Sequence, residues 1–199
     1  MSPRTEETNQ HIREEQRERI LKAAQKLFAR KGFTDTKMTD IAAAAKISYG
    51  LVYHYFANQE EIFTRLVELA LKSSTELLQY ALQQPGTPWD RLHWLVTEIL
   101  AGAQQEPEAF MVVLQAFTND TVPQEAREIA RQQSEVSHTT LIQLIQEGQA
   151  AGQVVAGDPD QLVTAFSWCI TGLALDMSFL ERPASPLPNA DNVLRILKA

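Results

Sequence analysis

The residues best suited to chemistry lie between positions 48 and 56, where one serine, one glycine, three tyrosines and one histidine occur together. Ser48 is a good N-cap for a short helix, and Gly50 would let its backbone approach another molecule closely. The rings at 49, 53, 54 and 55 cannot all be buried on so short a helix, so some must face outward. Outward hydroxyl and imidazole groups can bond to base edges and phosphates, which indicates DNA recognition.

The segment before these residues has the composition needed to position them. Residues 40–45 are rich in alanine, which favours a helix and lets a neighbouring helix pack closely. Two short helices joined by a tight turn at Lys46–Ser48 form a helix-turn-helix over about 37–56, whose second helix enters the major groove. Val52 and Phe56 should face inward. Lys46 stands where a left-handed residue is expected, at a cost of about 1 kcal/mol, and its cation can contact phosphate.

The basic residues are concentrated in one part of the sequence, as expected for a protein that binds DNA at one end. The chain carries a net charge of −7, yet residues 17–56 hold eight basic and three acidic groups, a net of +5. The remainder is therefore at −12. A basic segment on an acidic protein suits contact with phosphate at one end only.

Helical patterns extend over the rest of the chain and predict an all-α fold. Apolar residues recur at helical spacing over 15–31, and Gly32 stands where a left-handed C-terminal cap is expected. Helices are also predicted over 59–83, 88–104, 106–118, 123–151 and 158–180, with a short last helix over 191–198. We expect a flexible arm over 1–13, a three-helix DNA-binding domain over 14–74 and a helical effector-binding and dimerisation domain over 75–199.

The helix predicted over 158–180 is apolar on nearly all sides, which predicts burial against the core on one side and against a partner on the other. Asp176 lies within this apolar run, so it must find a polar partner or solvent. It could line a pocket, cross a dimer interface or belong to a local network.

Other classes of function find little support. The chain has no phosphate-binding glycine loop, no metal-ligand spacing and no glycine-flanked serine, so we expect no enzyme, cofactor or metal. A single cysteine, Cys169, fits a reducing cytoplasm. The chain has no apolar run long enough for a membrane span and no segment typical of a secretory signal, so a cytoplasmic protein is expected.

Several of these residues also carry a family resemblance. The strings Ile20–Ala24, Leu27–Phe33, Thr39–Ala42, Ser48–Phe56 and Glu60–Phe63 resemble the TetR (tetracycline-repressor) family of transcriptional regulators. The resemblance covers roughly 14–74. It implies a homodimer, joined through its last two helices, that binds a palindromic DNA operator and is released by a small-molecule effector.

The resemblance and the local chemistry together give candidate site residues. The DNA contacts expected are Thr39, Lys46, Ser48, Tyr49, Gly50, Leu51, Tyr53, His54, Tyr55 and Gln59. Leu51 and Gln59 depart from a common threonine and a common lysine of the family, so the operator sequence cannot be carried over. Gln59 can still bond to phosphate, but without a charge.

For a hydrophobic or amphipathic effector, the candidate residues are His93, Trp94, Phe110, Met111, Gln115, Phe166 and Asp176. The alternative is a ligand-binding or protein-interaction module on the same scaffold with weak or no DNA binding. The net acidity, Leu51 and Gln59 are its only support.

Overall fold

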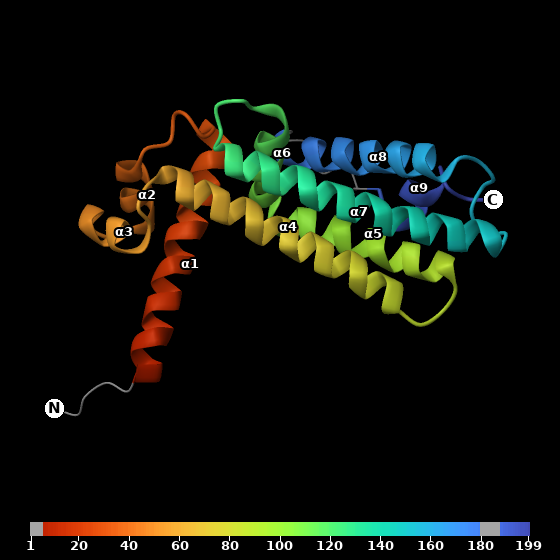
Figure 1. Cartoon of the computed structure of the whole chain (residues 1–199), viewed down its shortest axis with the longest axis horizontal. Helices are drawn as coiled ribbons and strands as arrows, with labels where there is room; N and C mark the ends of the chain where they lie inside the picture. Colours follow the sequence, from red (N-terminus) through yellow and green to blue (C-terminus); the bar gives the residue numbers. More distant parts are fainter. Residues whose placement is uncertain (1–5, 180–187) are drawn as a thin grey trace.

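The computed structural model describes residues 6–179 and 188–199, which fold into nine α-helices and no β-strand. The all-α prediction is confirmed. Three helices form the end of the molecule that we call the head: α1 (Glu6–Lys31), α2 (Met38–Ala45) and α3 (Tyr49–Tyr55). The others form the body: α4 (Gln59–Gln83), α5 (Pro88–Gln105), α6 (Pro107–Thr118), α7 (Gln124–Ala150), α8 (Pro159–Phe179) and α9 (Ala190–Leu194). Figure 1 shows α4 running from the head along the body.

α1 begins at Glu6, well before the start predicted near residue 15. Two pairs of side chains one turn apart support the added turns: Gln10 donates to Glu14 at 3.2 Å, and His11 lies 3.2 Å from Glu15. Acidic residues near a helix N-terminus also complement its dipole. Residues 6–13 of the predicted arm are therefore helical, and residues 1–5 lie outside the described part of the chain.

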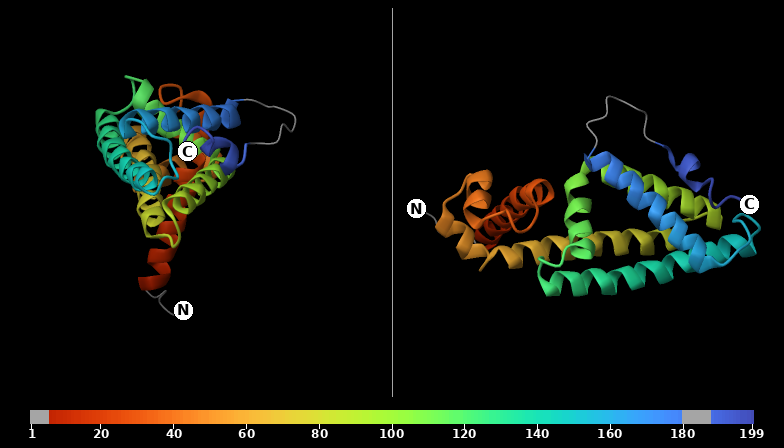
Figure 2. Two further views of the ribbon diagram at one scale, coloured as in Figure 1. Left: turned by 90° about the vertical axis from the view of Figure 1, so that its right-hand side faces the viewer. Right: turned by 90° about the horizontal axis from the view of Figure 1, so that it is seen from above.

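The core is divided into two hydrophobic clusters. The head cluster joins α1, α2, α3 and the start of α4 to parts of α6 and α7, with Phe28, Phe56 and Phe63 among its largest buried side chains. The body cluster joins the far end of α4 to α5, α7, α8 and α9. α6 runs across the long helices and reaches α1, α4, α7 and α8 (Figure 2). α6 therefore contacts both the head, through α1, and α8.

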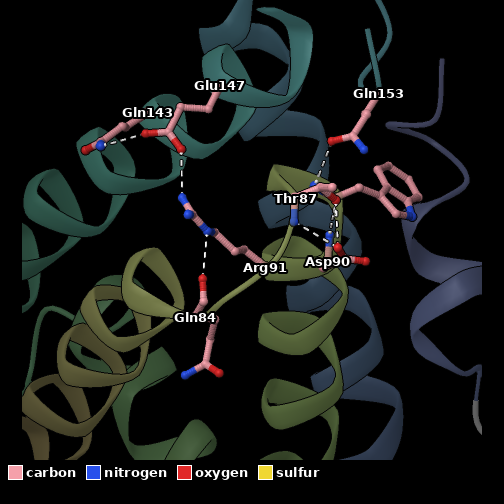
Figure 3. A network of polar contacts seen from close by, with 8 residues as sticks. Gln84, Thr87, Asp90, Arg91, Gln143, Glu147 and Gln153 are labelled. Atoms are coloured by element: carbon pink, nitrogen blue, oxygen red, sulfur yellow. Dashed lines mark hydrogen bonds and ion pairs between the residues drawn. The ribbon is translucent and has the colours of Figure 1, made fainter. Parts of the chain in front are cut away.

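The corner between α4 and α5 is fixed by a polar network (Figure 3). Arg91 donates from Nε to the carbonyl of Gln84 at 2.9 Å and pairs through Nη1 with Glu147 of α7 at 3.2 Å. Thr87 caps α5, and the hydrogen bonds from its backbone N–H and hydroxyl to Asp90 lower the pKa of that carboxyl. The network thus joins the end of α4, the start of α5 and the last turns of α7.

Arg91→Met should lower the free energy of unfolding by about 2 kcal/mol, because it leaves the Gln84 carbonyl and the partly buried Glu147 carboxylate without their donor. Urea unfolding measures the change. Arg131→Met is the matched control, since Arg131 pairs with Glu128 and Glu135 on the exposed surface of α7. Equal stability of the two variants would contradict a structural role for the corner network.

α9 is short, and its apolar side chains face the core. Ala190, Val193 and Leu194 are buried in the body cluster, where α9 packs on α5. None of the helices in the described part of the chain is both long enough and apolar enough to cross a membrane.

Candidate nucleic-acid interface

The inner faces of α2 and α3 are apolar and buried. Ile41 and Ala45 of α2 and Val52 of α3 are covered, as is Phe56 directly after α3. Both inward predictions for α3, Val52 and Phe56, are confirmed. Since the two buried positions lie four residues apart, they fix the rotation of α3 about its axis, and the opposite face must point to solvent.

Arg17 of α1 holds the C-terminal end of α3. Its guanidinium carbon lies 4.6 Å from the centre of the Phe56 ring, and its Nη1 donates to the carbonyl of Tyr55 at 3.4 Å. A helix leaves its last carbonyls without partners, so this donor satisfies one of them. Arg17 therefore ties α3 to α1, a role that the sequence did not reveal.

The outer face of α3 carries rings. Tyr49 is 49% exposed, Tyr53 is 43% exposed and His54 is also exposed. The prediction that these three side chains point outward is confirmed. Tyr55 is different, because its ring packs partly against the head cluster and lies edge-on to His54 at 5.2 Å.

Tyr49 and Tyr53 form one unit. Their ring centres are 4.8 Å apart in an edge-to-face arrangement, and the Tyr49 hydroxyl donates to the Tyr53 hydroxyl at 3.0 Å. That hydrogen bond raises the pKa of Tyr49 above its ordinary value, since deprotonation would lose it. Tyr49 thus stays protonated at physiological pH. Because the Tyr53 hydroxyl accepts in this pair, its own proton can be donated to a phosphate or a base.

The start of α3 is built as predicted. Ser48 is the N-cap and accepts from the Leu51 N–H at 3.3 Å. Gly50 is exposed, and a Cβ built on it would have no atom within 4 Å. Nothing inside the described chain therefore obstructs the backbone at this position, which is open to a molecule that approaches from outside. Leu51 is partly buried beside it.

The turn and the start of α2 place two further candidates. Lys46 is exposed and left-handed, with φ 56° and ψ 44°. Thr39 is exposed in the first turn of α2 but does not cap it. The N-cap is Lys37, whose N–H donates to the Asp40 carboxylate at 3.3 Å. The acidic side chain one turn later therefore closes this end of α2, and Thr39 is left exposed within the first turn.

This geometry coincides with a match to a known family. The model described as "Bacterial regulatory proteins, tetR family" matches residues 20–66, from the middle of α1 through the helix-turn-helix into α4. Proteins similar over most of the chain are transcriptional regulators as well. Residues 20–66 therefore form a TetR-type DNA-binding segment.

Three proteins illustrate the likeness beyond the matched segment. The HTH-type transcriptional regulator YfiR of Bacillus subtilis (strain 168) is 28% identical over 171 residues, which cover 83% of this chain and 80% of YfiR. The TetR-family regulator PfmR of Thermus thermophilus has a TM-score of 0.73 at 24% identity, covering 88% and 92% of the two chains. A transcriptional regulator of Saccharomonospora viridis, solved with choline, has a TM-score of 0.70 at 23% identity and covers 90% and 92%.

Within this TetR-type segment, Gln59 has an internal partner. Its side-chain nitrogen donates to the carbonyl of Phe33, in the loop after α1. One of its two N–H bonds is therefore committed to holding α4 against α1. The remaining N–H can still reach a phosphate.

The head and the body meet through Gln115 of α6. Its Oε1 accepts from the Phe33 N–H at 3.0 Å, and its Nε2 donates to the carbonyls of Phe28 at 2.9 Å and Met111 at 3.3 Å. Gly32, left-handed at φ 81° as predicted, turns the chain between Phe28 and Phe33 so that both backbone groups face Gln115. The effector role expected for Gln115 is therefore not supported, because its amide is engaged at the junction.

Gln115→Ala should lower the free energy of unfolding by about 1–3 kcal/mol, because the Phe33 N–H and the Phe28 carbonyl lose their partner at a partly buried junction. Hydrogen exchange at the Phe33 amide should become faster. Gln132→Ala, which changes an exposed glutamine of α7, is the control. Unchanged exchange at Phe33 would show that Gln115 does not hold the junction.

The other effector candidates separate into two groups. His93 is part-exposed and lies 3.4 Å from Asp191 at the surface beside α9, away from α6. The others lie on helices that contact one another: Trp94 of α5, Phe110 and Met111 of α6, and Phe166 and Asp176 of α8. Phe166 and Met111 are buried, and Trp94 stacks edge-on to Tyr80 at 5.3 Å. Five of the seven candidates thus lie on three helices that contact one another, whereas His93 lies at the surface and Gln115 is engaged at the junction between α6 and the head.

A hollow lies at the junction itself. It has a volume of about 640 Å³ between Arg17, the first turns of α4 and residues 121–125. Its lining includes Arg65, Glu60, Glu61 and Glu68, so it is predominantly charged. Such a lining does not suit the hydrophobic effector that the sequence predicts.

Proposed function

We propose that the protein is a cytoplasmic, homodimeric repressor that binds a palindromic operator and is released by a small hydrophobic or amphipathic effector. The observation that carries this proposal is the exposed pair Tyr49 and Tyr53 on a capped, close-packed α3. A rigid pair of hydrogen-bonding rings beside an unobstructed Gly50 suits close contact with the edge of the major groove.

For the dimer, we propose an interface formed by α8 and α7 rather than by the last two helices. The apolar side chains of α9 are already covered by the body cluster. α8 instead exposes Gln161, Ala165, Trp168 and Gly172 along one face, and Trp168 is 74% exposed. Small residues around a single large ring allow close approach of a second copy, with the ring as the central contact.

For the effector, we propose the region between the two hydrophobic clusters. Met111 of α6 and Ala174 of α8 are buried but belong to neither cluster. Phe110, Phe166 and Asp176 lie on the same two helices. A ligand here would displace α6, and α6 would transmit the displacement to α1 through Gln115. The choline complex of the Saccharomonospora viridis relative supports a small organic effector for this chain as well.

Selection of bound duplexes from a random DNA pool tests the proposal. The expected result is a palindrome whose half-sites are about one helical turn apart, with an affinity that falls steeply as salt rises. Recovery of no enriched sequence, or a shallow dependence on salt, would overturn it and favour a ligand-binding or protein-interaction module without DNA. The bond from Gln59 to Phe33 and the net charge of −7 are what favour that second candidate.

A further inference from the structure

Four basic side chains surround a hollow on the side of the head. Arg19, Lys22 and Lys26 lie on one face of α1, and Lys46 faces them from the end of α2. The hollow has a volume of about 330 Å³, and its apolar lining consists of Ala23, Ala44 and Ala45. We call the four cations the basic stripe. Small alanines between long cationic side chains leave room for a rod-like anion to approach.

No carboxylate within ion-pair distance neutralises the basic stripe in the described part of the chain. Some exposed basic residues elsewhere do have such partners: Lys31 lies 3.6 Å from Asp40, and Arg131 lies 2.9 Å from Glu128. The acidic residue nearest the stripe along the same helix, Glu18, makes no ion pair with Lys22 although the two are one turn apart. Four like charges held together without counterions attract an external anion.

The backbone at Lys46 gives independent support. It is the only non-glycine residue with positive φ among the described residues. A left-handed lysine costs about 1 kcal/mol relative to a relaxed residue, and glycine would avoid that cost. No internal contact of the Lys46 side chain compensates for it, since the side chain is exposed and makes no ion pair within the described chain. The left-handed backbone ends α2, because the N–H groups of Lys46 and Ile47 donate to the carbonyls of Ala43 and Ala42. A lysine in place of the favoured glycine adds an exposed cation at this point.

We infer that the basic stripe binds the phosphate backbone of DNA next to the bases read by α3. The inference rests on the proposed function. Ile47 alone separates Lys46 from Ser48, the N-cap of α3, so the stripe is continuous with the recognition surface. From Arg19 to Lys26 the helix advances about 10 Å, roughly the axial advance of three phosphates along one strand. The stripe therefore extends the protein–DNA contact beyond the helix-turn-helix to α1.

The test compares two triple variants with equal loss of charge on a duplex selected by the unmodified protein. In one, Arg19, Lys22 and Lys26 become glutamine. In the control, Arg195, Lys72 and Lys198 become glutamine, all exposed and in the body. The first should weaken binding on the order of 100-fold or more at 0.1 M salt and reduce the slope of log K against log salt by about 5, at about 0.9 per phosphate contact with three contacts in each of the two subunits. The control should leave the slope almost unchanged.

Lys46→Gly separates binding from folding. Glycine relieves the left-handed strain, so the variant should be at least as stable as the unmodified protein. The slope of log K against log salt should nevertheless fall by about 1.8, because each of the two subunits loses one phosphate contact. Equal slopes for the stripe and control variants would overturn the inference and would point to an acidic protein as the partner of the stripe. If the unmodified protein selected no duplex, the proposed function would fail together with the inference; normal selection with equal slopes would overturn the inference alone.

Discussion

Tyr53→Ala should weaken binding to the selected operator by about 100-fold or more, because each dimer loses the contact twice and each good base or phosphate contact contributes about 1–3 kcal/mol. The hydroxyl that accepts from Tyr49 also disappears, so the second ring loses its fixed position. The free energy of unfolding should hardly change, since Tyr53 is exposed and does not belong to the head cluster. Fluorescence anisotropy with the selected duplex measures the affinity, and urea unfolding measures the stability.

Two further variants should be measured in the same assays. Tyr80→Ala removes an exposed tyrosine from the body and should leave DNA affinity intact. Gly50→Ala adds a single methyl group that meets nothing within the protein and favours the helix, so stability should hold or rise while affinity falls. If Gly50→Ala bound the operator as tightly as the unmodified protein, DNA would not approach the backbone at Gly50. Unchanged affinity of Tyr53→Ala would remove α3 as the recognition helix.

The second large effect is expected at Trp168. Trp168→Glu should convert the dimer to a monomer, because it places a charge in the centre of each copy of the proposed interface and opposite its equivalent. A monomer holds only one half-site, so operator affinity should fall by about 10²–10⁴-fold through the loss of the second, linked contact. Sedimentation equilibrium gives the mass, and the same anisotropy assay gives the affinity.

Tyr80→Glu is the control for that substitution, since it also introduces a glutamate at an exposed aromatic position. It should remain dimeric. A Trp168→Glu protein that sediments as a dimer at micromolar concentration would place the interface elsewhere. A dimeric Trp168→Glu protein that no longer bound DNA would show that the residue acts within the subunit.

The features predicted correctly from sequence depend on residues close together in the chain. Ser48 caps α3 through a residue three positions away, and Gly32 turns the chain directly after α1. The burial of Val52 and Phe56 follows from helical spacing alone. Short-range hydrogen bonds and periodic burial are encoded locally, so the all-α fold and the outward rings of α3 could be anticipated.

The contacts that position the head depend on residues far apart in the chain and gave no local signal. Gln115 reaches Phe28 and Phe33 across more than eighty residues, and Arg17 reaches Tyr55 from another helix. A glutamine on a helix is ordinary in composition, so its partners emerge only when α6 crosses α1. The packing of α9 on α5 also depends on residues far apart in the chain. The expectation of a dimer interface through the last two helices did not include this packing.

α4 belongs to both hydrophobic clusters, with Phe63 in one and Leu78 in the other, and it is continuous over its 25 residues. A rigid rod of that length, about 37 Å, magnifies small rotations: a tilt of about 5° moves one end by about 3 Å relative to the other. A step of DNA is about 3.4 Å, so the same tilt in both subunits shifts their spacing by more than one base pair. Repacking near α6 that tilted each α4 by this amount would therefore put the two heads out of register with successive turns of the double helix.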